Sequence, residues 1–148
     1  MGKVSQVSQP YSPSATVYST TYTYDALGRT TKTQLPDGSA TSYLYQGNTV
    51  QVTDAASNSK TFTMDPFGNL LTVQETDPAI PGMVTTTYAY DVLNHLISVS
   101  MPRGTVTQTR TFNYNIYGTG VTAFLQSATN PENGMVAYNL NYAQDLIG

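Results

Sequence analysis

Hydrophobic and polar residues alternate along most of this 148-residue chain, in short runs that turn residues separate. Side chains in a β-strand point to opposite faces with a period of two, so each run predicts a strand. The predicted strands are Thr16–Tyr24, Arg29–Leu35, Ser39–Tyr45, Thr49–Thr53, Lys60–Met64, Leu71–Val73, Met83–Tyr90, Leu96–Met101, Val106–Tyr114, Val121–Gln126 and Met135–Leu140. Residues 1–15 alternate little and form a lead-in, for which we expect one edge strand at most.

The connections between these runs are short. Asp37-Gly38 predicts a two-residue hairpin turn with positive φ at both residues, and Asn133-Gly134 predicts a second turn of this kind. Pro78 and Pro81 are expected to end strand pairing in a longer loop. Since parallel strands need long crossovers, the pattern predicts an all-β antiparallel meander of hairpins.

The alternation also predicts two different sheet faces. One face is apolar and aromatic, and the other carries Thr, Ser and Gln, which is typical of a sheet that packs on one side only. The apolar face must still be covered. The sheet is therefore expected to curl on itself, to stack in layers, or to meet a second copy.

A motif of the form aromatic-x-aromatic-Asp-x-x-Gly returns along the chain about every 20–26 residues, which indicates a repeat architecture. Its clearest copy is Tyr22-Thr-Tyr-Asp-Ala-Leu-Gly28, and five weaker copies follow, including a shortened one at Tyr43-Leu-Tyr45 and a worn one at Tyr138. We expect residues 16–148 to hold five to six such units. The predicted turn residues of the motif are Tyr24, Asp25, Gly28, Arg29, Asp65, Gly68, Tyr90, Asp91, Tyr114 and Gly118.

Composition supports the all-β prediction. Only 10% of the residues are charged, whereas Tyr occurs 12 times and Cys never. The net charge of −3 and the scattered basic residues argue against a nucleic-acid partner. No apolar run approaches a membrane span, and the N-terminus has no signal core.

The sequence offers little catalytic chemistry. Asp25, Asp65 and Asp91 are repeat-related, so we expect them to form turns rather than to converge as an acid–base pair. Neither their spacing nor that of the other aspartates fits a known calcium loop. His95, the single histidine, is expected to face solvent without an acid partner. We expect no enzyme activity, no cofactor and no metal.

The tyrosines support two hypotheses. They pack the sheet through cross-strand pairs, or they offer exposed rings to a sugar. The residues considered for ligand contact are Tyr22, Tyr43, Tyr45 and Tyr88. Burial of their rows favours packing, and an exposed groove lined by them favours a glycan.

The chain resembles the YD-repeat family, which includes Rhs proteins, toxin-complex C components, wall-associated proteins and teneurins. The resemblance rests on Tyr24-Asp25-Ala-Leu-Gly28-Arg29, on Pro36-Asp37-Gly38, and on the stretch from Gly47 to Phe62. It covers most of the chain from about residue 16. Asn and Gln replace the usual turn residues at Asn94, Asn115, Asn141 and Gln144, which departs from the family pattern.

The resemblance implies a fold and a role. In this family the repeats form a curved or spiralling β-sheet shell that encapsulates a toxin or supports adhesion. The chain is then expected to be a non-enzymatic wall segment of a longer bacterial protein that is secreted or lies at the cell surface. Expected partners are further YD repeats or a second copy along the open strand edges, and an enclosed toxin domain. The alternative is a carbohydrate-binding or adhesion module with a glycan partner.

Overall fold

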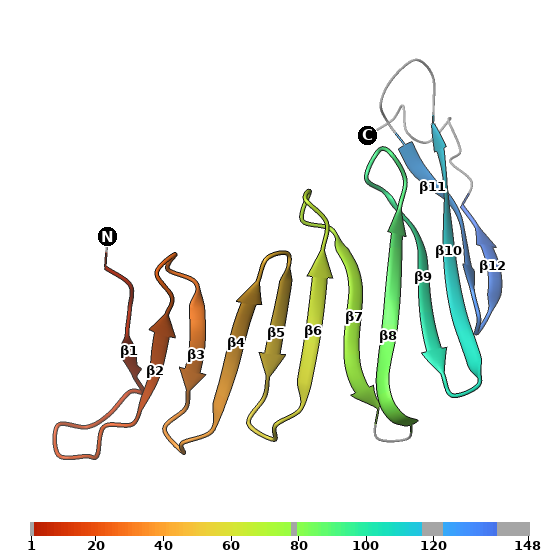
Figure 1. The fold of residues 1–148 in the computed structure, drawn as a ribbon. Helices are drawn as coiled ribbons and strands as arrows, with labels where there is room; N and C mark the ends of the chain where they lie inside the picture. The colour runs from red at the N-terminus through yellow and green to blue at the C-terminus, as the bar shows by residue number, and fades with distance from the viewer. Residues whose placement is uncertain (1, 78–79, 117–122, 139–148) are drawn as a thin grey trace. The chain divides into compact units, whose positions relative to one another are not determined.

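The strands of the sheet follow one another in space in the same order as in the chain. The computed structural model describes residues 2–77, 80–116 and 123–138, which contain twelve strands and no helix. Figure 1 shows the order of the strands along the sheet. The neighbouring strands from β1 to β7 and from β8 to β12 pair antiparallel. The strand order in the sheet runs from β1 to β12 without a crossover. The prediction of an all-β antiparallel hairpin strip is therefore confirmed.

The strands are β1 (Gln6–Ser8), β2 (Ser19–Tyr24), β3 (Thr30–Gln34), β4 (Ala40–Gln46), β5 (Thr49–Thr53), β6 (Ser59–Met64), β7 (Leu70–Asp77), β8 (Ile80–Tyr90), β9 (Leu96–Arg103), β10 (Val106–Ile116), β11 (Ala123–Asn130) and β12 (Gly134–Ala137). The chain divides into two units, Met1–Val84 and Thr85–Gly148.

Some strand boundaries differ from the prediction. The edge strand expected in the lead-in is β1, whereas the strand predicted from Thr16 begins only at Ser19. β8 begins at Ile80 and includes Pro81, so the expectation that this proline ends the pairing is wrong. Proline is compatible with the first residues of a strand because only its missing N–H and its fixed φ restrict it. Pro78 lies outside the described residues.

The Asp37-Gly38 turn is also corrected. Leu35 N donates to Ser39 O (2.8 Å) and Gly38 N donates to Leu35 O (3.0 Å), so the bonded pair Leu35–Ser39 encloses a loop of three residues. Gly38 has a φ of 87°, whereas the φ of Asp37 is not positive. At the last hairpin, too, the glycine alone has positive φ, and Asn130 pairs with Gly134 across a three-residue loop. In each hairpin a glycine at the C-terminal end of the loop, Gly38 or Gly134, adopts the left-handed conformation. This glycine makes the three-residue loop compatible with the twist of the strands.

In the first unit the strand register separates the side chains into two faces. Tyr22 lies opposite Thr33, Tyr43 opposite Val52, and Val50 opposite Phe62. We call this side, with Tyr22, Tyr43, Tyr45, Val50, Val52, Phe62 and Val73, the tyrosine face; it also carries Thr33, Thr41, Lys60 and Glu75. The other side, which we call the threonine face, pairs Thr23 with Lys32, Gln51 with Thr61, and Thr63 with Thr72.

The second unit repeats this division. Val99 lies opposite both Tyr88 and Arg110, and Ala128 lies opposite both Phe112 and Val136. On the opposite side, the pairs are Thr87 with Ser100, Ser100 with Thr109, Ser98 with Thr111, and Asn113 with Ser127. The prediction of one apolar-aromatic face and one Thr/Ser face is confirmed in both units.

The core of the described residues is thin. The buried apolar side chains are Val73, Val84, Val99 and Ala128, and no side chain is less than 2% exposed. Within residues 2–77, strands contact only the strands next to them in sequence. Residues 2–77 thus form a single layer, and among these residues nothing packs on the tyrosine face as a second layer.

The repeat motif also sets a β-bulge. Between Thr23 and Tyr24 of β2, the register skips one residue of β3, from the pair Thr23–Lys32 to the pair Tyr24–Thr30. The same one-residue skip comes immediately before Met64, Tyr90 and Tyr114. The shortened copy, with its two-residue Gly47-Asn48 turn, has no bulge. A bulge increases local twist, so the motif specifies both the turn and the twist of the hairpin that it closes.

Candidate functional site: the aspartate turns and the tyrosine face

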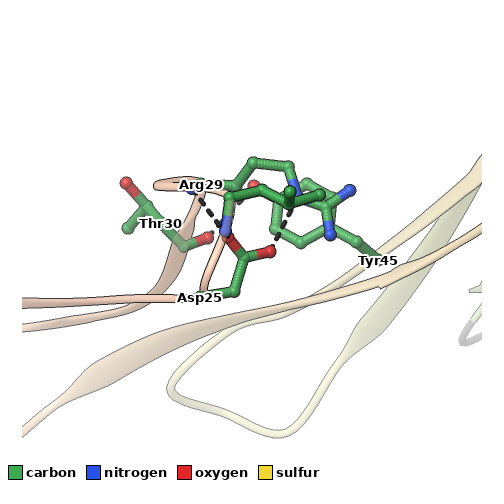
Figure 2. Close-up of polar contacts among 5 residues, drawn as sticks. Asp25, Arg29, Thr30 and Tyr45 are labelled. Carbon is green, nitrogen blue, oxygen red and sulfur yellow. Dashed lines mark hydrogen bonds and ion pairs between the residues drawn. The ribbon is translucent and has the colours of Figure 1, made fainter.

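Asp25 organises the turn between β2 and β3 (Figure 2). Its Oδ1 accepts hydrogen bonds from the backbone N–H of Leu27 (3.0 Å) and of Arg29 (2.9 Å). Its Oδ2 accepts a hydrogen bond from Arg29 Nε at 2.7 Å. Two backbone bonds of 2.9 Å close the loop, from Gly28 N to Asp25 O and from Asp25 N to Arg29 O. Gly28 provides the positive φ of 77° that lets the chain turn back.

Three further turns have the same construction. Each begins with an aspartate whose Oδ1 accepts the N–H groups of the third and fifth turn residues and whose Oδ2 contacts the fifth side chain. The pairs of first and fifth residues are Asp54 with Asn58, Asp65 with Asn69, and Asp91 with His95. The fourth residue always has positive φ, and it is Ser57, Gly68 and Asn94 in these turns. We call this arrangement the aspartate turn.

The hydrogen bonds keep these carboxylates ionised. In all four turns the pKa of the aspartate is lowered from its ordinary 3.8, and the largest cause is a hydrogen bond from the fifth turn residue. That bond comes from the backbone N–H of Arg29 and His95, and from the side chains of Asn58 and Asn69. A carboxylate with a lowered pKa that is occupied by its own turn is a weak proton acceptor. In the described residues, no three His, Asp or Glu side chains cluster as metal ligands would.

His95 differs from the expectation. Its Nδ1 lies 2.9 Å from Asp91 Oδ2, and its ring stacks on Tyr114 with centroids 4.7 Å apart and planes at 22°. The side chain is 26% exposed. The predictions that it faces solvent and that it has no acid partner are therefore wrong. As the fifth residue of an aspartate turn, His95 is held beside the carboxylate of Asp91 and over the ring of Tyr114 in β10.

Arg29 occupies the equivalent place in the first unit. Its guanidinium carbon lies 4.2 Å from the ring centroid of Tyr45, and Tyr45 Oη donates to Thr30 O at 3.0 Å (Figure 2). Arg29 stands between β2 and β3, whereas Tyr45 belongs to β4. The turn side chain thus links its own hairpin to the next strand, as His95 links the β8–β9 turn to Tyr114 of β10. We call each such set of aspartate, fifth residue and tyrosine a turn brace.

The tyrosines considered for ligand contact are all half-buried, which applies to Tyr22, Tyr43, Tyr45 and Tyr88. Arg29 already covers the ring of Tyr45. Tyr24 donates its hydroxyl to Val4 O at 2.7 Å, and Tyr90 is half-buried at the end of β8. Gly118 lies outside the described residues. The exposed fraction of these tyrosines is therefore larger than expected for a core and smaller than expected for a sugar-binding surface.

Two hollows open on the tyrosine face of the first unit. The larger, about 410 Å³, is lined by residues of β3, β4 and the Asp54 turn, including Leu35 and Thr41. The smaller, about 160 Å³, is lined by Val52, Phe62 and Lys60 with two turn residues. Neither of these two hollows is lined by a tyrosine, so the geometry of a sugar-stacking groove is not met at either.

Comparison with protein-family models gives no match for this chain, and comparison with curated proteins gives none. The likeness to YD repeats therefore rests on the sequence motifs alone. In the described residues, no helix is long and apolar enough to cross a membrane.

The turn brace at Arg29 gives a testable expectation. Replacing Arg29 by alanine should lower the free energy of unfolding by about 1 kcal/mol, because a cation–π contact of this kind contributes about 0.5–1 kcal/mol and the Asp25 bond is lost as well. Arg29→Asn is the matched control, since asparagine keeps a donor for the carboxylate as at Asn58 and Asn69. Urea unfolding of both variants, alone and with Tyr45→Leu, measures the coupling. Equal loss in the presence and absence of Tyr45 would show that the stack contributes nothing.

Proposed function

We propose that the chain is a structural, non-enzymatic module that forms part of a β-sheet wall. The observation that supports this most strongly is the repeated aspartate turn, which occurs four times in the described residues and is braced to the next hairpin at Arg29 and His95. The repeated chemistry of these turns is used to fix hairpins, and their carboxylates are engaged by the turn itself. A strip built in this way extends by adding hairpins and acts by enclosing or supporting another molecule.

The edge of the sheet at β1 supports continuation by further strands. Tyr22 N donates to Ser5 O, and Gln9 N donates to Tyr18 O, so the odd residues of this segment bond to β2. Gln6 and Ser8 therefore point their N–H and C=O groups away from the sheet. Unpaired edges of this kind template pairing with another strand. Further repeats of a longer protein, or a second copy of this chain, are the proposed partners at this edge.

The YD-repeat resemblance extends this proposal. It supports a parent protein that is secreted or exposed at the surface of a bacterium, and it supports a toxin domain as the enclosed cargo. The alternative function is a carbohydrate-binding or adhesion module. That alternative is favoured by one observation, namely that Tyr22, Tyr43 and Tyr88 remain partly accessible on the tyrosine side of their sheets.

A double proline variant tests the wall proposal. Gln6→Pro with Ser8→Pro removes the two outward N–H groups while the β1–β2 bonds of Ser5, Val7 and Gln9 remain. We expect this variant to lose the edge-to-edge component of self-association, measured by sedimentation velocity over a concentration series. Val7→Pro is the control, because it disrupts pairing with β2 and should alter the circular dichroism spectrum. Unchanged association of the double variant would contradict edge pairing.

Glycan binding is tested separately. Titration of the chain against an array of neutral and acidic oligosaccharides, with Tyr43→Ala as the comparison, should detect no binding that depends on Tyr43. A sugar that binds the wild type and loses affinity at least tenfold in this variant would favour the adhesion function over the wall.

A further inference from the structure

The tyrosine face of the first unit is apolar but uncovered. Among described residues 2–77, Val73 alone is buried, while Tyr22, Tyr43, Val50, Val52 and Phe62 are half-buried. Since this unit is a single layer, these side chains receive cover only from their neighbours in the sheet. An apolar sheet face is stable in water when another layer packs on it. The face therefore has the character of one half of a core.

The charged side chains on and beside this face are paired. Lys60 and Glu75 lie on the face, in the cross-strand row of Tyr43 and Val52, and Lys60 Nζ is 2.6 Å from Glu75 Oε2. At the end of the face, Arg29 Nε lies 2.7 Å from Asp25 Oδ2. The adjacent row, which contains Val50 and Phe62, has no charged side chain. Two identical faces of this kind meet without like-charge repulsion, whereas a strongly charged partner finds no complement here.

The available area is sufficient for a dimer. Six strands, β2 to β7, spaced about 4.8 Å apart and about 17–20 Å long, give a face of roughly 500 Å². Two such faces bury roughly 1,000 Å² in total, which reaches the lower limit of a specific interface. The hollow of about 160 Å³ beside Val52 and Phe62 gives room for a side chain of the facing copy.

We propose that a second copy of this chain packs its tyrosine face on the tyrosine face of the first, forming a two-layer sandwich around a two-fold axis. The same residues then lie on both sides of the interface, and the sheets lie about 10 Å apart. Val50, Phe62 and Tyr43 lie at the centre and become buried. This inference is independent of the wall function, because it uses the face of the sheet and not its edge.

Two variants with the same charge change test the face. The background is the edge-blocked chain, Gln6→Pro with Ser8→Pro, in which face packing is the remaining contact. Val50→Glu places a carboxylate between Tyr45 and Phe62 on the tyrosine face, and Gln51→Glu places one on the threonine face of the same strand. We expect the background and Gln51→Glu to be dimers by light scattering. In Val50→Glu the dissociation constant should rise at least about tenfold, because a buried unpaired charge is costly.

Tyrosine nitration supplies a second readout that needs no substitution in the face. Mass spectrometry of the edge-blocked chain, nitrated at low and high protein concentration, should show protection of Tyr22 and Tyr43 as the concentration rises. Tyr18, which is 56% exposed and precedes β2, is the internal control and should react equally at both concentrations. A monomeric edge-blocked chain, equal behaviour of the two glutamate variants, or unprotected Tyr43 would each overturn face packing and leave edge pairing untouched.

Discussion

Replacing Val99 by alanine is expected to lower the free energy of unfolding by about 2 kcal/mol, the loss typical of removing two buried methyl groups from a core that relaxes only in part. Val99 is 8% exposed in the middle of β9. Tyr88 and Arg110 lie opposite it on the neighbouring strands. In a protein with so few buried side chains, each of them contributes a large share of the stability. Urea unfolding followed by circular dichroism measures the change.

Val106→Ala is the matched control for this prediction. Val106 belongs to the next strand, β10, but is 62% exposed, so the same substitution should change the stability by less than about 0.5 kcal/mol. Equal losses in the two variants would show that the burial of Val99 does not determine its contribution.

Acid is expected to destabilise the fold through the aspartate turns. The pKa values of Asp25, Asp54, Asp65 and Asp91 are lowered in the folded chain, mainly by hydrogen bonds from the fifth turn residue. The pKa of Asp37 is also lowered, mainly by a hydrogen bond from the hydroxyl of Ser39. After unfolding, these groups return to about 3.8, so the unfolded chain binds more protons near and below this pH. The stabilisation is therefore complete above pH 3.8 and is lost as the pH falls through the folded pKa values.

The urea midpoint, measured from neutral pH down to about pH 2, should show this loss as a decline that begins as the pH falls through about 4. The variant Asp65→Asn keeps an oxygen that accepts from Phe67 and Asn69 but has no charge to neutralise. Its stability should be lower at neutral pH and should fall less steeply in acid. An identical pH profile of variant and wild type would contradict a role of the ionised carboxylate.

Much of this fold is predictable because local signals agree along the chain. Alternation defines the strands, and the short Asp- and Gly-containing connections require antiparallel neighbours. The two-faced character of the sheet follows from the same period, as Tyr43 opposite Val52 and Gln51 opposite Thr61 illustrate. The four β-bulges of the described residues were not predicted, since a one-residue skip just before Tyr24 or Met64 leaves the alternation of each single strand nearly unchanged.

The aspartate turns were predicted only in part. The turn at Asp54 does not match the motif, because Gln51 and Thr53 stand at its two aromatic positions and Ser57 replaces the glycine. Of the fifth residues, the motif includes only Arg29. The sequence does carry a signal for the others, because Arg29, Asn58, Asn69 and His95 each lie four positions after an aspartate and each carry a nitrogen that contacts its carboxylate.

The contacts of His95 could not be predicted from its position in the sequence alone. Its partner Asp91 is four positions away, but its stacking partner Tyr114 belongs to the strand after the next hairpin connection. Such a contact depends on the register of two strand pairings, which the sequence does not state. For the same reason the sequence left open what the tyrosines contact. The structure places Tyr22, Tyr43 and Tyr45 on one face of the first unit at intermediate burial, which is the observation behind the face-packing proposal and the carbohydrate-binding alternative.

The central claim is that this single-layered sheet completes itself with another sheet. Static light scattering of the wild-type chain across a concentration series tests it most directly. The account predicts a dimer or a larger assembly, whose mass falls toward 16.0 kDa only on dilution. A mass of 16.0 kDa at every concentration would contradict it, because an apolar tyrosine face and an open β1 edge would then both remain in water.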